Sequence, residues 1–309
     1  MSGRVVILLA TYNGAVFLPE QLASYLTQTH ADWTLLWRDD GSTDATIPVM
    51  AGFAARVGAD RCRRLDAPAG RLGVQGSFLA LLRAALPSLG PGDAVAFSDQ
   101  DDVWLPEKLA RGMAALAGAA EGVPALACAR QRLVDATLAP LGESPQLRRP
   151  PGFPAALAQN IATGCTISLN RAAAALVAGS RAPEDMLHDW WSYVLVAAAS
   201  GRVLADPLPL VLYRQHVANA VGAPPSTLGR ARGALVRGPG AFMHLFRANV
   251  AALAAQPALL SPAARRDVAR LQAALTGGRR RRLAALRLPG LVRQTALETL
   301  TFRLWFLLG

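Results

Sequence analysis

Three carboxylates, Asp99, Asp101 and Asp102, lie within four positions just after the apolar run 94–97. Like charges this close raise one another's pKa unless a cation compensates them. Hard divalent ions such as Mg²⁺ and Mn²⁺ prefer carboxylate oxygens and also bind phosphate oxygens. The spacing therefore indicates metal-assisted chemistry on a phosphate-bearing substrate. The alternative is a polar loop in which an aspartate caps the helix that begins at Pro106-Glu107-Lys108.

Polar motifs also follow two earlier apolar runs. Thr11-Tyr12-Asn13-Gly14 comes after a strand expected at residues 5–10, and Arg38-Asp39-Asp40-Gly41 follows one expected at residues 34–37. Ser42 or Thr43 is the expected N-cap of the next helix. Open α/β sheets bind ligands at the carboxyl ends of their parallel strands. We therefore expect these motifs and the acidic cluster to meet over one crevice.

The elements that would position these motifs alternate between strand-like and helical patterns over the first 100 residues. This alternation predicts βαβ units in a largely parallel sheet flanked by helices. The break at Pro224-Pro225 predicts a catalytic domain at residues 1–224 and a basic extension at residues 225–309. Strands are expected at residues 5–10, 34–37, 62–65, 93–97, 125–133, 163–169 and 203–213, and helices at 18–29, 77–86, 107–118, 171–178 and 188–200.

Positive charge is concentrated in this extension. The chain has 309 residues and a formal net charge of +11. Residues 225–309 contain 14 arginines and two acids, a net +12, so residues 1–224 sum to −1. Arginine alternates there with leucine and alanine at helical spacing. The extension is either an interfacial segment, with its arginines toward anionic headgroups and its leucines, Trp305 and Phe306 toward lipid acyl chains, or a helical unit packed on the catalytic domain.

The rest of the composition indicates a cytoplasmic protein. We expect no membrane span, because no apolar stretch reaches the roughly 18 residues that a spanning helix needs. We also expect no signal peptide, because the apolar run after Arg4 is short. Cys62, Cys128 and Cys165 lack the spacing of a metal site or a disulfide framework, so reduced, buried thiols are the simplest interpretation.

Five motifs in this order resemble the family-2 glycosyltransferases with the GT-A fold. Besides the three above, they are His188-Asp189-Trp190-Trp191 and Tyr213-Arg214-Gln215-His216, which are most similar to the rhamnosyltransferase-like branch. The resemblance covers about residues 4–220. It implies an inverting, metal-dependent enzyme of cell-surface polysaccharide synthesis that moves a sugar from a nucleotide-diphosphate donor to a hydroxyl of a glycan or lipid-linked acceptor. It favours dTDP-rhamnose as donor, with other dTDP- or UDP-sugars as alternatives.

The resemblance also implies roles for single residues. Asp189 would be the general base, and Asp39 would accept a hydrogen bond from the base N3–H of the nucleotide. Asp102 would support the metal site or cap a helix. Mg²⁺ or Mn²⁺ would be held by Asp101, Asp99 and His216. The nucleotide would be bound by Thr11, Tyr12, Asn13, Asp39, Arg71 and Asp99. The substrate would be bound by Trp190, Trp191, Gly164, Cys165 and Arg214, with Asn219 assisting.

Several of these residues also have structural interpretations. His188 and Cys165 would serve packing, and one of the two tryptophans would be core. Arg214 would be salt-bridged in a turn, and Asp40 would order the turn at Gly41. Lys108 would be solvated.

Two other functions compete with glycosyl transfer. A sugar nucleotidyltransferase would also use clustered aspartates and a divalent ion, but the loop at residues 11–14 carries no cation for phosphate. A non-enzymatic module that binds membrane or nucleic acid would use the basic extension alone. Such a module would leave the aspartate motifs without a role. We do not expect nucleic acid to be a partner.

Overall fold

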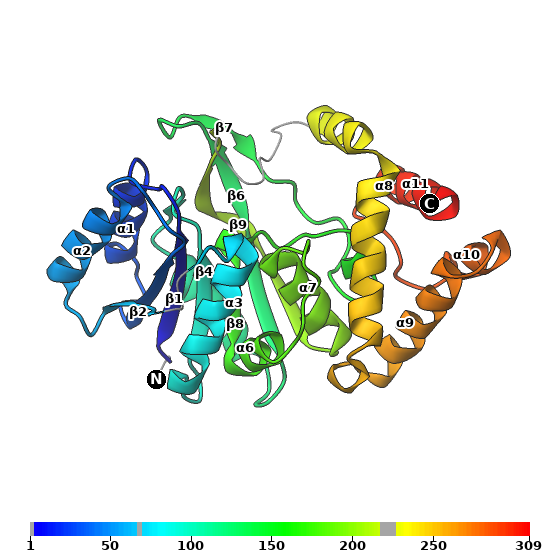
Figure 1. The fold of residues 1–309 in the computed structure, drawn as a ribbon, viewed down its shortest axis with the longest axis horizontal. Coiled ribbons are helices and arrows are strands. Elements are labelled where there is room, and N and C mark those ends of the chain that lie inside the picture. Colours follow the sequence, from blue (N-terminus) through cyan, green and yellow to red (C-terminus); the bar gives the residue numbers. More distant parts are fainter. Residues whose placement is uncertain (1–2, 67–69, 217–226) are drawn as a thin grey trace.

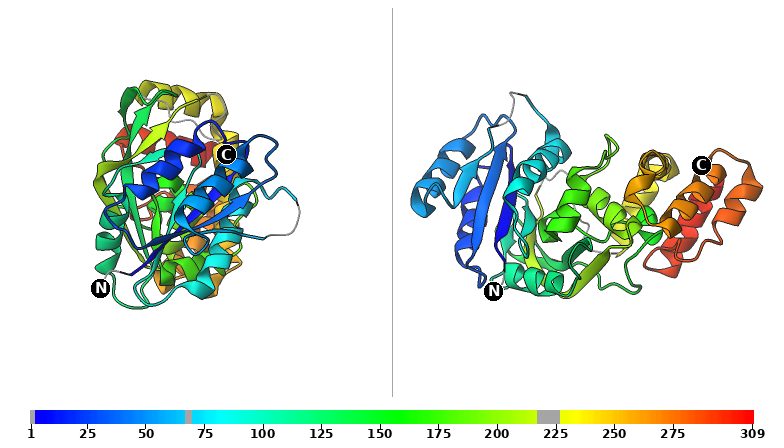
Figure 2. Two further views of the ribbon diagram at one scale, coloured as in Figure 1. Left: turned by 90° about the vertical axis from the view of Figure 1, so that its left-hand side faces the viewer. Right: turned by 90° about the horizontal axis from the view of Figure 1, so that it is seen from below.

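The computed structural model describes residues 3–66, 70–216 and 227–309, and only the backbone of residues 227–238. Asn219 and the break at Pro224-Pro225 lie outside the described residues, so the domain boundary stays a prediction. The described chain forms a mixed α/β structure in which a curled sheet carries helices on both faces (Figures 1 and 2). A group of helices from the end of the chain packs at one side.

The sheet has nine strands in the order β3-β2-β1-β4-β8-β6-β9-β5, with β7 paired to β6. Its longest pairings, β1 with β2 and β6 with β9, are parallel, whereas β8 joins β4 and β6 through short antiparallel pairs. The predicted, mostly parallel sheet is therefore confirmed. The strands are β1 Val5–Thr11, β2 Trp33–Asp39, β3 Cys62–Arg64, β4 Ala94–Ser98, β5 Val103–Trp104, β6 Ala125–Val134, β7 Pro140–Glu143, β8 Ser168–Asn170 and β9 Arg202–Arg214.

Alternate residues of β1 enter two different cores. Val6 and Leu8 pack with α3, α6 and α7, whereas Val5, Ile7 and Leu9 pack with α1 and α2. A strand directs successive side chains to opposite faces, so a strand covered on both faces is apolar throughout.

The helices are α1 Leu18–Leu26, α2 Thr46–Val57, α3 Gly73–Ala85, α4 Lys108–Ala117, α5 Ala155–Ala158, α6 Arg171–Ala178, α7 His188–Ala198, α8 Thr227–Ala254, α9 Pro262–Leu275, α10 Arg279–Ala285 and α11 Ala296–Leu308.

Two predicted boundaries are wrong. The strand expected at residues 163–169 begins instead with a short 3₁₀ helix, Gly164–Thr166, and only then enters β8. Neither Ser42 nor Thr43 caps α2, because the Asp44 carboxylate accepts the hydrogen bond from the Thr46 N–H. The hydroxyl of Ser42 is engaged by Asp39 in the preceding turn.

The C-terminal helices share a core with the sheet domain. Phe246 of α8 and Phe302 and Phe306 of α11 are buried in the same apolar cluster as Trp191 of α7. The packed, helical extension is therefore confirmed. Trp305 and Phe306 do not face lipid as one alternative required, because both are buried. No helix in the described residues is both long and apolar enough to cross a bilayer.

This shared core predicts that α11 contributes to the stability of the whole chain. Phe302 is fully buried and contacts Phe242, Phe246 and Phe306. Phe302→Ala should lower the free energy of unfolding by about 3–5 kcal/mol in one cooperative transition, as measured by urea denaturation. Leu304→Ala, at a position 53% exposed, is the control and should change it by at most about 0.5 kcal/mol. Equal effects of the two variants would contradict the packing.

Candidate active site

Asp39, at the carboxyl end of β2, closes the turn that follows. Its Oδ2 accepts hydrogen bonds from the N–H groups of Gly41 (3.0 Å) and Ser42 (2.8 Å). Its Oδ1 accepts from the hydroxyls of Thr11 (3.0 Å) and Ser42 (2.5 Å). A carboxylate has about four acceptor sites, so the protein's own donors already engage them. The predicted contact to a nucleotide base stays a prediction, and it requires one of these donors to give way.

Tyr12 and Asn13 lie in the loop after β1, at the same edge of the sheet. Asn13 has a φ of 47°, a left-handed conformation that asparagine tolerates, and its Oδ1 accepts from the Thr43 N–H (2.8 Å). The backbone N–H and C=O of Tyr12 both bond the side-chain amide of Gln100, at 2.8 and 2.9 Å. Gln100 lies inside the acidic motif, so this one side chain ties the loop after β1 to the loop after β4.

A pocket of about 540 Å³ opens beside this loop. Arg71 lines it and stacks its guanidinium over the ring of Tyr12, 3.9 Å from the ring centroid. A flat cation–aromatic pair beside a carboxylate suits a nucleoside, which offers both a π-face and hydrogen-bonding edges. The lining residues are Arg38, Asp39, Gly41, Ser42, Ile47, Arg64, Leu65, Asp66, Gly70 and Arg71.

A buried ion pair supports this pocket. Arg38 Nη1 lies 2.5 Å from Asp40 Oδ1, and Asp40 also accepts from the N–H groups of Leu72 (2.7 Å) and Gly73 (2.9 Å). Burial raises the pKa of Asp40, but these donors outweigh burial and hold it below its usual value. Asp40 therefore orders the segment that leads into α3, rather than the Gly41 turn for which it was expected.

The outer part of the acidic cluster consists of Asp101 and His216. The two are 115 positions apart in sequence, yet His216 Nε2 lies 2.9 Å from Asp101 Oδ2. The His216 ring packs beside Phe17, with ring centroids 4.8 Å apart. Both side chains are partly exposed, so both can reach a ligand in the cleft. The structure thus brings two of the three predicted metal ligands together.

The inner part consists of Asp99, Asp102 and Cys165, whose nearest ligand atoms all lie within 4.8 Å of one another. Asp102 is fully buried; its Oδ1 accepts from the Arg214 N–H (3.1 Å), and its Oδ2 has no hydrogen-bond partner in the described residues. Burial and the neighbouring carboxylates raise the pKa of Asp99 to about 8 and that of Asp102 well above its usual range. Cys165 is fully buried, so direct substrate contact by its side chain is not supported.

Lys108 is buried against this inner part, and its predicted solvation is therefore wrong. It is 2% exposed, and its Nζ lies 3.6 Å from the centroid of the Trp104 ring with no hydrogen-bond partner in the described part of the chain. Burial lowers the pKa of Lys108 to about 7, while nearby Cys165, Asp102 and Asp99 act to raise it.

The residues present fit a hard divalent ion. The outer pair offers a carboxylate oxygen and an imidazole nitrogen on partly exposed side chains, and the charge of Asp101 also acts on the carboxyl of Asp99. Burial is the largest cause of the raised pKa values of Asp99 and Asp102, and the neighbouring carboxylates add to it, so a bound cation would favour their ionised forms. Lys108 is the basic group on the buried side, but burial lowers its pKa to about 7, so at neutral pH it offsets only part of the charge of the cluster.

The Arg214 side chain is buried and holds neighbouring segments together, so it is not exposed to bind a phosphate. Its side chain is 1% exposed, its Nε donates to the Asp101 carbonyl oxygen (2.8 Å), and its other nitrogens bond the Ala136 carbonyl oxygen and Glu20. The predicted direct contact with substrate is therefore not supported. The structural interpretation of Arg214 as a salt-bridged residue agrees better with the structure. Arg214 pairs with Glu20 and joins the end of β9 to the acidic loop through the Asp101 carbonyl oxygen.

Asp189 lies in the first turn of α7 and is buried. Its Oδ2 accepts from the Gly164 N–H (3.1 Å) and Asn160 Nδ2 (3.3 Å), and its Oδ1 from the Trp190 N–H (2.5 Å). Burial raises the pKa of Asp189 to about 6, against these hydrogen bonds. The charge of Asp189 also raises the pKa of Asp99, which places the two carboxylates near one another.

Gly164 lies against His188 and Asp189, and its contact with substrate stays a prediction. A Cβ at Gly164 would meet His188 Nε2 at 3.0 Å and the Cβ of Asp189 at 3.6 Å, so glycine permits this close approach. His188 itself stacks on Phe78, with centroids 3.9 Å apart, and burial lowers its pKa to about 3. His188 is therefore a neutral core residue, as its structural interpretation predicted.

The two tryptophans after Asp189 differ in environment. Trp191 is fully buried and donates from Nε1 to the Ser180 hydroxyl (2.8 Å), so its predicted substrate contact is wrong. Trp190 is only partly buried and donates from Nε1 to the Ala156 carbonyl oxygen (2.7 Å). Successive residues of a helix point about 100° apart, so one of two adjacent tryptophans can face the cleft while the other enters the core.

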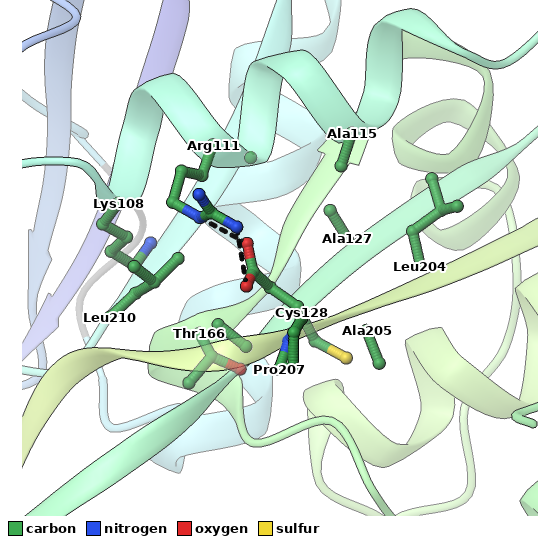
Figure 3. A pocket seen from close by; sticks show the side chains of 13 residues that line it. Lys108, Arg111, Ala115, Ala127, Cys128, Thr166, Leu204, Ala205, Pro207 and Leu210 are labelled. Carbon is green, nitrogen blue, oxygen red and sulfur yellow. Dashed lines mark hydrogen bonds and ion pairs between the residues drawn. The ribbon is translucent and has the colours of Figure 1, made fainter. Parts of the chain in front are cut away.

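A smaller pocket of about 250 Å³ lies behind the acidic cluster, between α4, β6 and β9 (Figure 3). Its lining is largely apolar, with Ala127, Cys128 and Leu204 among the residues. The Arg111–Asp206 ion pair, with Nε 2.6 Å from Oδ2, lies across it. This pocket lacks the predicted nucleotide-binding residues, so the larger pocket at Asp39 is the better candidate for a nucleoside.

Two sequence comparisons match this chain to glycosyltransferases. The model of the family Glycosyl transferase family 2 matches residues 6–140, which hold the first three motifs. The dTDP-rhamnosyl transferase RfbG of Shigella flexneri is 27% identical over 228 residues, which cover 70% of this chain and 74% of RfbG.

Solved structures give the same fold. S. aureus TarS in complex with UDP-GlcNAc has a TM-score of 0.59 at 15% identity, covering 87% of this chain and 71% of TarS. The mannosyltransferase PcManGT from Pyrobaculum calidifontis, in complex with GDP-Man and Mn²⁺, has a TM-score of 0.52 at 19% identity, covering 99% and 88% of the two chains. The predicted GT-A fold is confirmed.

Proposed function

Because this chain is a glycosyltransferase with a family 2 domain at residues 6–140, we propose that it is an inverting, divalent-metal-dependent enzyme that uses a nucleotide-diphosphate sugar. The sugar passes to a hydroxyl of a glycan or lipid-linked acceptor during cell-surface polysaccharide synthesis. The proposal is supported by three links between these groups: Gln100 joins the loop after β1 to the acidic motif, His216 lies 2.9 Å from Asp101, and the charge of Asp189 acts on Asp99.

In a direct displacement, separate residues would accept the proton, hold the metal ion and contact the sugar. Asp189 accepts the proton of the acceptor hydroxyl as that oxygen attacks the anomeric carbon from the side opposite the diphosphate, which inverts the configuration. Gly164 and Asn160 hold the Asp189 carboxylate in place. Asp101, Asp99 and His216 would hold Mg²⁺ or Mn²⁺, which when bound neutralises charge on the departing diphosphate. Trp190 is the aromatic surface available to a sugar ring.

The nucleotide would lie between the loop after β1 and the pocket at Asp39. Thr11 and Asn13 would hold the turn after β2 through their hydrogen bonds, and the Arg71–Tyr12 stack would offer a flat surface to the base. The similarity to a dTDP-rhamnosyl transferase supports dTDP-rhamnose as the donor. The three buried, free cysteines support a cytoplasmic location. Neither a nucleotidyltransferase nor a non-enzymatic module is favoured, because the matched family and RfbG are glycosyltransferases.

Donor binding should appear as thermal stabilisation. Saturating dTDP-rhamnose with Mn²⁺ should raise Tm by roughly 4 °C, since ligand at about 100 times its Kd adds about 2.7 kcal/mol and a chain of this length unfolds with a large entropy. UDP-GlcNAc and GDP-mannose, measured in parallel, should give smaller shifts, and EDTA should remove most of the effect. If no nucleotide sugar shifted Tm in the presence of Mn²⁺ or Mg²⁺, the proposed function would be wrong.

A further inference from the structure

Helix α11 has two apolar faces, of which only one is covered. Phe302, Trp305 and Phe306 enter the core. On the other side, Leu297, Leu300, Leu304 and Leu308 are spaced three or four positions apart and therefore line one face of the helix. They are 71%, 66%, 53% and 66% exposed. We call these four residues the α11 leucine face.

Exposed leucines occur singly on most proteins, but a contiguous row of four on one helix indicates an interaction surface. The other large exposed apolar residues of the described chain are scattered, for example Val16, Leu141 and Leu208. In Figure 1, α11 (red) and α10 (orange) lie at the end of the molecule away from β1 and β2. The leucine face is therefore separate from the proposed active site.

Cations gather beside this face. Arg282 of α10 donates from Nη1 to the carbonyl oxygens of Phe306 (3.4 Å) and Leu307 (3.5 Å), which places the run Arg279–Arg282 at the carboxyl end of α11. Arg279, Arg280 and Arg281 are exposed, and so is Arg303 within α11. Residues 279–309 contain seven arginines and one acid, a net +6.

That one acid is already engaged. Glu298 Oε2 accepts hydrogen bonds from the N–H (3.0 Å) and hydroxyl (2.9 Å) of Thr295 in a capping box, and its Oε1 accepts from Gln159 (3.3 Å). No other carboxylate in this segment offsets the arginines. An apolar row flanked by uncompensated cations matches the boundary of a bilayer with anionic headgroups, where acyl chains take leucine and phosphates take arginine.

We propose that α10 and α11 form a docking surface for an anionic membrane, with the α11 leucine face toward the acyl chains and Arg279–Arg281 and Arg303 toward the headgroup phosphates. A second copy of the chain fits this surface less well. Self-association through a two-fold axis at this face would bring two arginine clusters together with no free acid between them. The surface follows from the residues themselves; its use to reach a lipid-linked acceptor rests on the proposed function.

Co-sedimentation of the full-length chain with lipid vesicles tests the surface. Binding should be roughly tenfold or more stronger with phosphatidylcholine vesicles that contain phosphatidylglycerol than with phosphatidylcholine alone. The double variant Leu300→Gln/Leu304→Gln removes apolar surface without adding charge, and it should weaken binding roughly tenfold. Arg279→Gln/Arg280→Gln/Arg281→Gln should weaken binding to the anionic vesicles alone. Leu208→Gln, an exposed leucine of β9, is the matched control and should bind as the wild type does.

Binding that ignored lipid charge, or that survived both multiple substitutions, would overturn the proposal. The proposal would also be overturned if the wild type bound no vesicles and instead formed a dimer that the substitutions Leu300→Gln/Leu304→Gln dissociated. Tm of each variant checks the fold, and donor-induced stabilisation measured on the same samples separates the two proposals. Stabilisation by donor without vesicle binding would reject the docking surface alone, whereas vesicle binding without stabilisation by any donor would reject the glycosyltransferase proposal alone.

Discussion

Replacing Asp189 by asparagine should lower kcat for sugar transfer by roughly 10²–10⁴-fold, the usual contribution of a positioned general base. Asparagine has nearly the same shape but takes up no proton at neutral pH. Donor-induced stabilisation should persist, because Asp189 contacts the acceptor side of the cleft in our proposal. Asp185→Asn, whose carboxylate is highly exposed and pairs only with His244, is the control and should keep wild-type turnover.

The pH profile gives a second test of Asp189. Burial raises its pKa to about 6, so the base is ionised above that pH and protonated below it. Turnover of the wild type should therefore fall as pH drops through about 6, approaching tenfold per unit. The residual activity of Asp189→Asn should lack this acidic limb. If the variant kept wild-type kcat, or lost activity only by losing donor binding, Asp189 would not be the base.

Asp101→Asn should abolish the part of donor stabilisation that depends on Mn²⁺ and lower turnover by roughly 10²–10³-fold, as expected when several kcal/mol of charge stabilisation is lost. The amide keeps the size of the side chain and can still bond His216, but it is a weaker ligand for a hard cation. Mn²⁺ titrations followed by donor-dependent Tm measure the effect directly.

Asp102→Asn is the informative comparison for Asp101. Its carboxyl is fully buried with a pKa far above the usual range, so the neutral amide resembles the form already favoured there. We expect this variant to keep most of its metal response. If Asp102→Asn lost the response and Asp101→Asn kept it, the ion would belong in the inner cluster with Asp99 and Cys165.

The sheet and the meeting of its motifs could be predicted from the sequence because strand periodicity is local. The apolar run at β1 and the polar residues directly after it indicate a buried strand that ends at a cleft. The contact between Asp101 and His216 was predictable only through the resemblance, since nothing local links the two residues across 115 positions.

Burial was less predictable, because it depends on which elements cover a residue. Lys108 begins a helix with an ordinary amphipathic pattern, and its position becomes internal because α4 packs on β6, β8 and β9 and its Nζ lies over the Trp104 ring. Arg214 is buried because the distant side chain of Glu20 and the carbonyl oxygens of Ala136 and Asp101 surround it. In α11 both faces are apolar, so the sequence could not say that the aromatic residues are covered and the leucines exposed.

The most direct test of the central claim follows the anomeric proton by NMR while the wild-type chain turns over dTDP-rhamnose with Mn²⁺, using water or an added glycan hydroxyl as acceptor. We predict a first-formed product of inverted configuration, with turnover lost on addition of EDTA and in Asp189→Asn. A first-formed product that retained the donor's configuration would contradict the account, as would no turnover of any nucleotide sugar in the presence of metal.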